Sequence, residues 1–482
     1  MAVDPAGTAA ECRERRSLIA SARAAARESI DFAAYREVAS QVKYPVAAML
    51  VSQTVLGFGV AAALSRVLGA RAFGEYAVVM TVAGIFQLAA GFPVETGIPK
   101  FLAEARQERA EAVRGYYAAG LRLRVGACAV AMLLTAVLAR WLSGVYGIAH
   151  LSQPVVLGSL SLCLLAPISL YYLACIQGME MPKRWATGSV LSALLVFGLA
   201  VLGAVGFGEW GHRGLLGLMA VGWALAAAVC VGLARGALGF LWARTDWRSE
   251  PDWRSEPDWR YVRDLIRFLL PVWLIPLLGF GSRTILKSYL AVKQGPVPVG
   301  QFEIALTLLL HLGTVYHACM IVFVPAWARL YARRDGAALM RSISQVRGAL
   351  LGVAAVYGAV LALGGQWVVP AIFGADQAGA VPAARIIGVV MPVMTGGWVA
   401  ATTNIVSSRT RIMGQANIIW FCIAIPVGLV AIPSLGAAGG SVSFLAAYGV
   451  FTWFYISRAR PFFREIGVWA REQQGDSAAG SV

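Results

Sequence analysis

The sequence has 482 residues, of which 59% are hydrophobic and only 14% are charged, whereas soluble domains carry about 25% charged residues. Lys and Arg outnumber Asp and Glu, which gives a formal net charge of +16. This composition excludes a soluble globular protein and predicts a polytopic membrane protein. The sequence has no RNA-binding signature, so we expect its basic loops to meet anionic membrane lipids and no nucleic acid.

Residues 1–43 form a polar, Ala-rich and basic N-terminal tail without the apolar core of a cleavable signal peptide. Apolar positions between 18 and 33 share one helical face, and basic positions lie on the other. This pattern predicts either an interfacial helix on the membrane surface or a disordered tail.

Twelve apolar segments follow, each long enough to cross about 30 Å of hydrocarbon as a helix. They do not alternate with a period of two, which favours helices over barrel strands. We therefore expect an all-α membrane protein with about 12 transmembrane helices. The segments cover roughly 44–68, 74–98, 115–141, 151–177, 185–207, 214–241, 265–292, 300–326, 346–373, 381–406, 412–433 and 436–457.

The loops that hold Lys and Arg predict the orientation, because positively charged loops stay in the cytoplasm. The N-terminal tail carries seven of these residues, and the loop between the second and third segments carries four. The alternate loops carry fewer, namely Arg66, Arg71, Arg140, Arg213 and Lys293. Both termini are expected in the cytoplasm.

Two predicted outer turns, 69–76 and 295–302, share a pattern 226 residues apart. Each has two glycines five residues apart and an aromatic residue two positions later. Chance could produce one such pattern, but its place in the first outer turn of each half favours duplication. We expect pseudo-symmetric six-helix bundles at 44–243 and 265–458, followed by a cytoplasmic tail at 459–482.

Residues 244–264 are expected to form a cytoplasmic linker between the bundles. This linker contains the hexapeptide DWRSEP twice, at 246–251 and 252–257. A recent expansion in a tolerant linker accounts for the repeat.

Motifs for chemistry are lacking in the sequence. The seven cysteines show no close pair at metal-ligand or redox spacing and are expected to fill apolar space. We find no metal-binding cluster, no phosphate-binding glycine-rich loop and no nucleophile elbow. The sequence therefore predicts a transporter that is not an enzyme, without catalytic residues, metal or cofactor.

The seventh and eighth segments carry ionisable groups well inside apolar runs. Arg283 and Lys287 lie one helical turn apart in the seventh. Such groups are costly in a membrane unless they face a partner or a water-filled cavity, although Lys287 could also snorkel to the outer interface. An Arg at this depth suits phosphate, because its planar fork binds two oxygens at once.

The eighth segment places five polar residues on one helical face, which are Glu303, Thr307, His311, Thr314 and His317. They could form a polar lining that takes part in ion coupling, since His titrates near neutral pH. Alternatively, the histidines are neutral and hydrogen-bonded between helices, and Glu303 pairs with Lys287 or Lys293.

The remaining charged candidates lie in other segments. Glu95 could face the cavity or form a structural ion pair with Arg122 or Arg124. Arg385 could snorkel to the membrane interface. The predicted cationic substrate-binding set contains five residues, which are Arg283, Lys287, Arg66, Arg122 and Arg385. Glu95 joins Glu303, His311 and His317 as a possible coupling group or polar lining.

The motif LSRVLGARAFGEY at 64–76 resembles the first outer turn of bacterial polysaccharide flippases, which export O-antigen and exopolysaccharide repeat units. They belong to the multidrug, oligosaccharidyl-lipid and polysaccharide exporter superfamily. RTILKSYL at 283–290, followed by GQF at 300–302, is similar to the matching second-half region. The second turn lacks the Leu-Gly and Phe-Gly pairs of the first.

The resemblance implies two bundles around a central cavity that work by alternating access. The implied substrate is an undecaprenyl-pyrophosphate-linked oligosaccharide used in surface polysaccharide or lipopolysaccharide synthesis. Polysaccharide polymerase and chain-length machinery are the implied partners. Rival interpretations are a cation-coupled multidrug exporter of the same superfamily, a lipid II flippase, and a membrane glycosyltransferase or polymerase, which the short outer loops disfavour.

Overall fold

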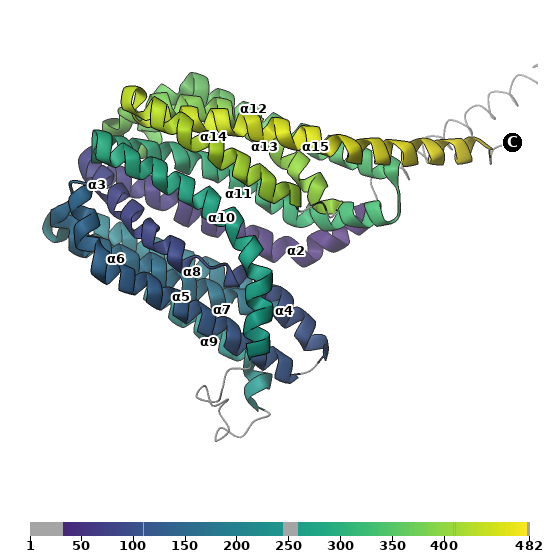
Figure 1. Ribbon diagram of the computed structural model, residues 1–482, viewed down its shortest axis with the longest axis horizontal. Coiled ribbons are helices and arrows are strands. Elements are labelled where there is room, and N and C mark those ends of the chain that lie inside the picture. The colour runs from purple at the N-terminus through teal and green to yellow at the C-terminus, as the bar shows by residue number, and fades with distance from the viewer. Residues whose placement is uncertain (1–31, 109, 244–258, 408, 410, 480–482) are drawn as a thin grey trace, which may run out of the picture.

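The computed structural model describes residues 32–479, apart from 109, 244–258, 408 and 410. The expected surface helix before residue 32 and the DWRSEP repeat lie outside these residues. The described part of the chain is built from helices that run roughly side by side (Figure 1).

Ten helical stretches of the described chain are long and apolar enough to cross a membrane, and an eleventh is bent by 41° between Leu270 and Val272. The first of the ten, Lys43–Leu88, has 46 residues. It is broken at Gly69, where φ is 73°, so it contains the first two expected segments. The all-α membrane fold is confirmed, and with this break the spans agree with the predicted number.

The first half of the chain contains the following elements: α2 (Phe32–Gln53), the π-helix η1 (Thr54–Gly59), α3 (Val60–Ala90), α4 (Val94–Glu108), α5 (Ala110–Val145), η2 (Ala149–Leu151), α6 (Ser152–Ser159), the π-helix η3 (Leu160–Leu165), α7 (Ala166–Gly178), α8 (Pro182–Val205) and α9 (Phe207–Ala243). The second half contains α10 (Trp259–Gln294), α11 (Pro296–Ala332), α12 (Gly336–Phe373), η4 (Ala375–Ala380), α13 (Val381–Val406), α14 (Arg411–Leu435) and α15 (Ala437–Ala479). Helices α4 to α9 gather in one lobe and α11 to α15 in a second (Figure 1).

Three boundaries differ from the expected ones. The second segment ends at Ala90 and a new helix starts at Val94, because Pro93 cannot continue the hydrogen-bond ladder. Helix α10 begins at Trp259, inside the expected linker, since Val262 packs into the first lobe with α4 and α5. Helix α15 continues through the expected tail to Ala479.

The extension of α15 is held by apolar packing. Phe462 and Ile466 are fully buried in a cluster with Trp327 of α11 and Leu339 of α12. This contact explains why residues with a basic, loop-like composition remain helical.

The two predicted outer turns have the same backbone geometry. Gly69 has φ 73° and ψ 176°, and Gly295 has φ 83° and ψ −171°, a region that disfavours residues with a side chain. The second glycine of each turn meets the other, since a Cβ built on Gly300 would lie 3.0 Å from the Cα of Gly74. We call the end of the molecule that holds Gly74 and Gly300 the contact end.

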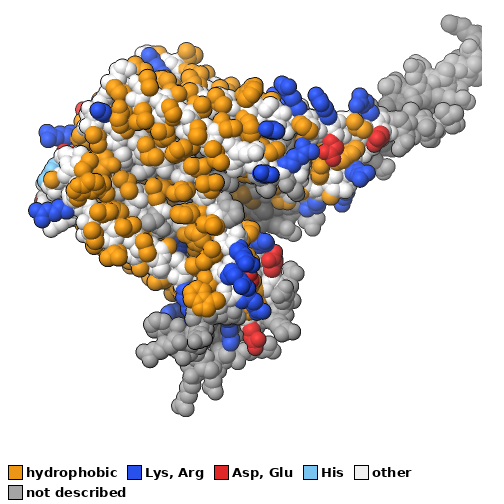
Figure 2. All heavy atoms as spheres, viewed as in Figure 1, with side chains coloured by type: hydrophobic (Ala, Val, Ile, Leu, Met, Phe, Trp, Pro, Cys, Tyr) orange, Lys and Arg blue, Asp and Glu red, His pale blue; other side chains and the backbone are white. Residues whose placement is uncertain are grey.

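The opposite end, where α11 meets α12 and from which α15 extends, is here called the tail end. The ribbons of the two lobes diverge toward it (Figure 1). Figure 2 shows hydrophobic side chains over the body of the visible face, whereas Lys and Arg gather on the two arms near the tail end. An apolar belt with charged ends is the surface that a bilayer requires.

Candidate functional site

A cavity of about 280 Å³ lies between the two halves of the chain, where η1 and α3 face α11. Four of the five polar positions predicted to share a face of the eighth segment line its wall, and they are Glu303, Thr307, His311 and Thr314. The facing wall includes Gln53, Phe58 and Tyr76. These four residues share one helical face, as the sequence spacing predicted, and that face borders the cavity.

The wall opposite α11 is shaped by the π-helix Thr54–Gly59. A π-turn inserts one extra residue into a helix and is frequent at functional sites. Here it carries Phe58 to the cavity, with its ring centroid 5.1 Å from that of His311. Hydropathy gives no signal for a π-turn, so sequence reasoning missed Phe58.

Lys287 and Glu303 form an ion pair at this wall. The Lys287 Nζ lies 2.8 Å from Glu303 Oε2, and the two side chains are 15% and 30% exposed. Of the two partners considered for Glu303, the structure selects Lys287. Lys293 lies instead over the Tyr289 ring.

We expect Lys287→Gln to lower the free energy of unfolding by about 1.5 kcal/mol, because Glu303 would lose its charged donor in a partly buried site. A double-mutant cycle with Glu303→Gln, measured by thermal unfolding in detergent, should recover a coupling of the same sign. Additive single effects would show that the pair contributes nothing.

His317 does not line the cavity. Its side chain is exposed, its Nδ1 lies 2.8 Å from the Gly313 carbonyl of the same helix, and its ring packs near Trp398. Of the five polar positions predicted to share one helical face, the last that lines the cavity is therefore Thr314.

Arg283 lies one turn from Lys287 and points into the second lobe. It is half-buried, and its guanidinium lies near the Tyr448 hydroxyl of α15. Its Nε is buried without a hydrogen-bond partner. Arg283 therefore carries an unused donor inside the lobe.

Glu95 pairs with Arg124, one of its two predicted partners. Arg124 is only 1% exposed and also donates from Nη1 to the Ala90 carbonyl at 2.7 Å, whereas Glu95 is 34% exposed. The pair joins α4 to α5 beside the break in the second segment. It lies away from the cavity around His311.

The other predicted cationic residues lie apart from one another. Arg66 donates to the Ala371 carbonyl at the contact end, where Gln377 also reaches the Ser65 carbonyl. Arg385 is exposed and donates to Gln366 at 2.9 Å.

Arg122 lines a separate, mainly apolar groove of about 510 Å³ between α5 and α10, with Phe92 and Trp259. The structure thus places Glu303, which is paired with Lys287, and His311 on one wall but does not gather the five predicted cations. Over the described ranges, no three His, Cys, Asp or Glu side chains are arranged as metal ligands would be.

The comparisons with known proteins agree with this architecture. Residues 46–331, more than half of the chain, match the family described as polysaccharide biosynthesis protein. The chain belongs to this family. Comparison with curated proteins gives no match.

Comparison with solved structures shows which fold this member of the polysaccharide biosynthesis family has. It is similar to the inward-facing conformation of a multidrug resistance MATE family transporter of the MOP superfamily, with TM-score 0.68, 14% identity, and coverage of 88% of this chain and 99% of that one. For the Vibrio cholerae MATE transporter VcmN in its bent form the TM-score is 0.60, with 13% identity and coverage of 91% and 99%.

A third neighbour is a MOP superfamily transporter from Pyrococcus furiosus, described as having a binding pocket of reverse polarity. Its TM-score is 0.57, with 14% identity and coverage of 89% of this chain and 97% of that one. These likenesses establish that the family member has the fold of MOP superfamily transporters.

Proposed function

We propose that this protein is a flippase that carries undecaprenyl-pyrophosphate-linked oligosaccharide repeat units across the bacterial inner membrane, for the synthesis of a surface polysaccharide such as O-antigen or exopolysaccharide. Family membership and the MOP fold support a transporter that serves polysaccharide synthesis. Polysaccharide polymerase and chain-length machinery are the partners that such a role requires.

The charge balance inside the membrane is the observation that carries the proposal. The twelve predicted segments contain three carboxylates, Glu75, Glu95 and Glu303. Each lies in an ion pair, with Arg71, Arg124 and Lys287 as partners. A transporter of organic cations would need an unpaired carboxylate near its path. The three carboxylates are paired and positive side chains are in excess in the segments, which favours an anionic substrate.

The orientation and mechanism follow from the same features. Lys and Arg gather on the arms near the tail end (Figure 2), and under the positive-inside rule this favours a cytoplasmic tail end. The lobes meet at the contact end through Gly74 and Gly300 and diverge toward the tail end. This arrangement supports an inward-facing state of an alternating-access cycle.

Reconstitution distinguishes the proposed function from its rival. In proteoliposomes with the purified chain, a polyprenyl-pyrophosphate oligosaccharide labelled on the sugar should become accessible to a glycosidase outside the vesicles within minutes, and empty vesicles should show no such exposure. Efflux of ethidium without movement of the lipid-linked sugar would reject the flippase and support the multidrug exporter.

A further inference from the structure

Arg283 has no carboxylate partner among the described residues. From Ala305 to Arg464 the sequence contains two acidic residues, Asp335 and Asp376. Asp335 caps α12 by accepting a hydrogen bond from the Ala338 amide, and Asp376 lies in η4 at the contact end. Glu303, the acidic residue of α11 that is nearest in sequence, forms an ion pair with Lys287. A charge inside this lobe is therefore left without a counter-ion from the described chain.

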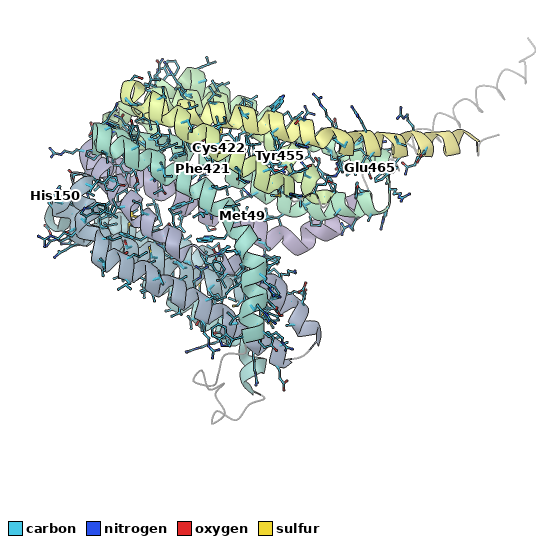
Figure 3. The ribbon with its side chains drawn as sticks, viewed as in Figure 1. Met49, His150, Phe421, Cys422, Tyr455 and Glu465 are labelled. Atoms are coloured by element: carbon cyan, nitrogen blue, oxygen red, sulfur yellow. The ribbon has the colours of Figure 1, made fainter. Side chains whose placement is uncertain are left out.

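A second buried donor lies beside Arg283. Trp420 of α14 is 4% exposed, and its Nε1 has no hydrogen-bond acceptor. It immediately precedes Phe421 and Cys422, which Figure 3 labels on α14. Cys422 is exposed, so Trp420 occupies the opposite, inward face of the helix.

Tyr448 connects the two donors. It is 6% exposed, its ring centroid lies 5.7 Å from that of Trp420, and its hydroxyl is the group that Arg283 approaches. The proton of this hydroxyl can be donated to an acceptor. Three helices, α10, α14 and α15, thus bring together two buried donors without an acceptor, Arg283 Nε and Trp420 Nε1, and the hydroxyl of Tyr448.

Buried N–H and O–H groups are nearly always hydrogen-bonded, so unused donors mark a place for an acceptor. A guanidinium, an indole N–H and a phenol suit an oxyanion, because each donates and the guanidinium adds charge. A metal cation is disfavoured at the same place, since no carboxylate is near. Arg283 is half-buried, so a ligand can approach from its exposed side.

We propose that Arg283, Trp420 and Tyr448 form an oxyanion-binding site inside the second lobe. Resting on the proposed flippase function, the ligand is an oxyanion of the carried molecule, either the pyrophosphate linker or the carboxylate of an acidic sugar. The site lies apart from the cavity around His311 and adds two residues to those predicted from sequence.

Calorimetry on the purified full-length chain tests the site, with inorganic pyrophosphate and free glucuronate as probes. Trp420→Phe and Tyr448→Phe each remove one donor and keep the ring, so each should weaken binding about tenfold, or about 1.4 kcal/mol. Arg283→Lys keeps the charge but loses the fork and should weaken binding further. Arg347→Gln is the matched control, because that cation is exposed on α12 of the same lobe, and it should bind as the unmodified chain does.

The probes separate the two ligand sources. Binding of pyrophosphate alone assigns the site to the lipid linker, and binding of glucuronate alone assigns it to the sugar. If neither probe binds, or if Arg347→Gln weakens binding as much as Trp420→Phe, the site is rejected. If binding depends on these donors but the chain moves no lipid-linked sugar, the site stands and the flippase function is rejected. If Trp420→Phe and Tyr448→Phe leave both binding and transport unchanged, the site is rejected and the flippase function stands.

Discussion

Replacing Gly74 by alanine is expected to open the contact end and to reduce export of the surface polysaccharide severely. A Cβ at this position would lie 2.4 Å from the Pro296 carbonyl oxygen and 2.7 Å from its carbon. Both are backbone atoms, so α3 and α11 must separate. Overpacking of this kind costs about 1–3 kcal/mol, which shifts the balance between closed and open contact ends roughly 5- to 150-fold.

The state of the contact end can be measured with a buried reporter. Ser65 is 1% exposed, and its carbonyl accepts from Gln377 of the second half. In a cysteine-free background, Ser65→Cys should react slowly with a membrane-impermeant thiol reagent and much faster when Gly74→Ala is added.

Gly217→Ala is the matched control for this experiment, because a Cβ there meets no atom within 4 Å. It should leave both labelling and export unchanged. Unchanged labelling together with normal export in Gly74→Ala would show that close approach of the two glycines is not needed for the cycle.

Glu95→Gln is expected to destabilise the protein by about 3–5 kcal/mol, because it leaves the charge of Arg124 buried without its partner. Arg124 is 1% exposed and its Nε already lacks an acceptor, so it cannot turn to water. The readout is the fraction of folded, monodisperse protein after heating in detergent.

The two partners should respond unequally. Arg124→Leu is expected to be milder than Glu95→Gln, since Glu95 is 34% exposed and can be hydrated when left alone. The double variant Glu95→Gln/Arg124→Leu should recover much of the loss, because it removes the buried charge itself. Equal losses in both single variants, without recovery in the double, would contradict a structural role for the pair.

Several features of the fold were predictable from local sequence. The free energy of placing a segment in a bilayer depends on its own side chains, so hydropathy predicted the helices and the all-α class. The paired glycines at 69–76 and 295–302 predicted two turns with matching geometry, because positive φ depends on the residue itself. Helical periodicity likewise placed Glu303 and His311 on one wall.

The extended α15 was decided by packing that local sequence does not reveal. In the sequence Phe462 is part of a basic tail, and only the tertiary structure shows that it packs against α11 and α12. The π-turn that brings Phe58 to His311 has no signature in composition, because any apolar residues can adopt it.

By itself, the sequence determined that the protein is a membrane bundle of helices with an excess of positive charge in its apolar segments, and it predicted two related halves. Only the tertiary structure decided which of those charges are neutralised. Glu95 and Glu303 each had more than one possible partner, and helix packing chose Arg124 and Lys287. The same packing left Arg283 beside Tyr448 without a carboxylate, because the energy of a charge in a membrane depends on the groups that other helices bring to it.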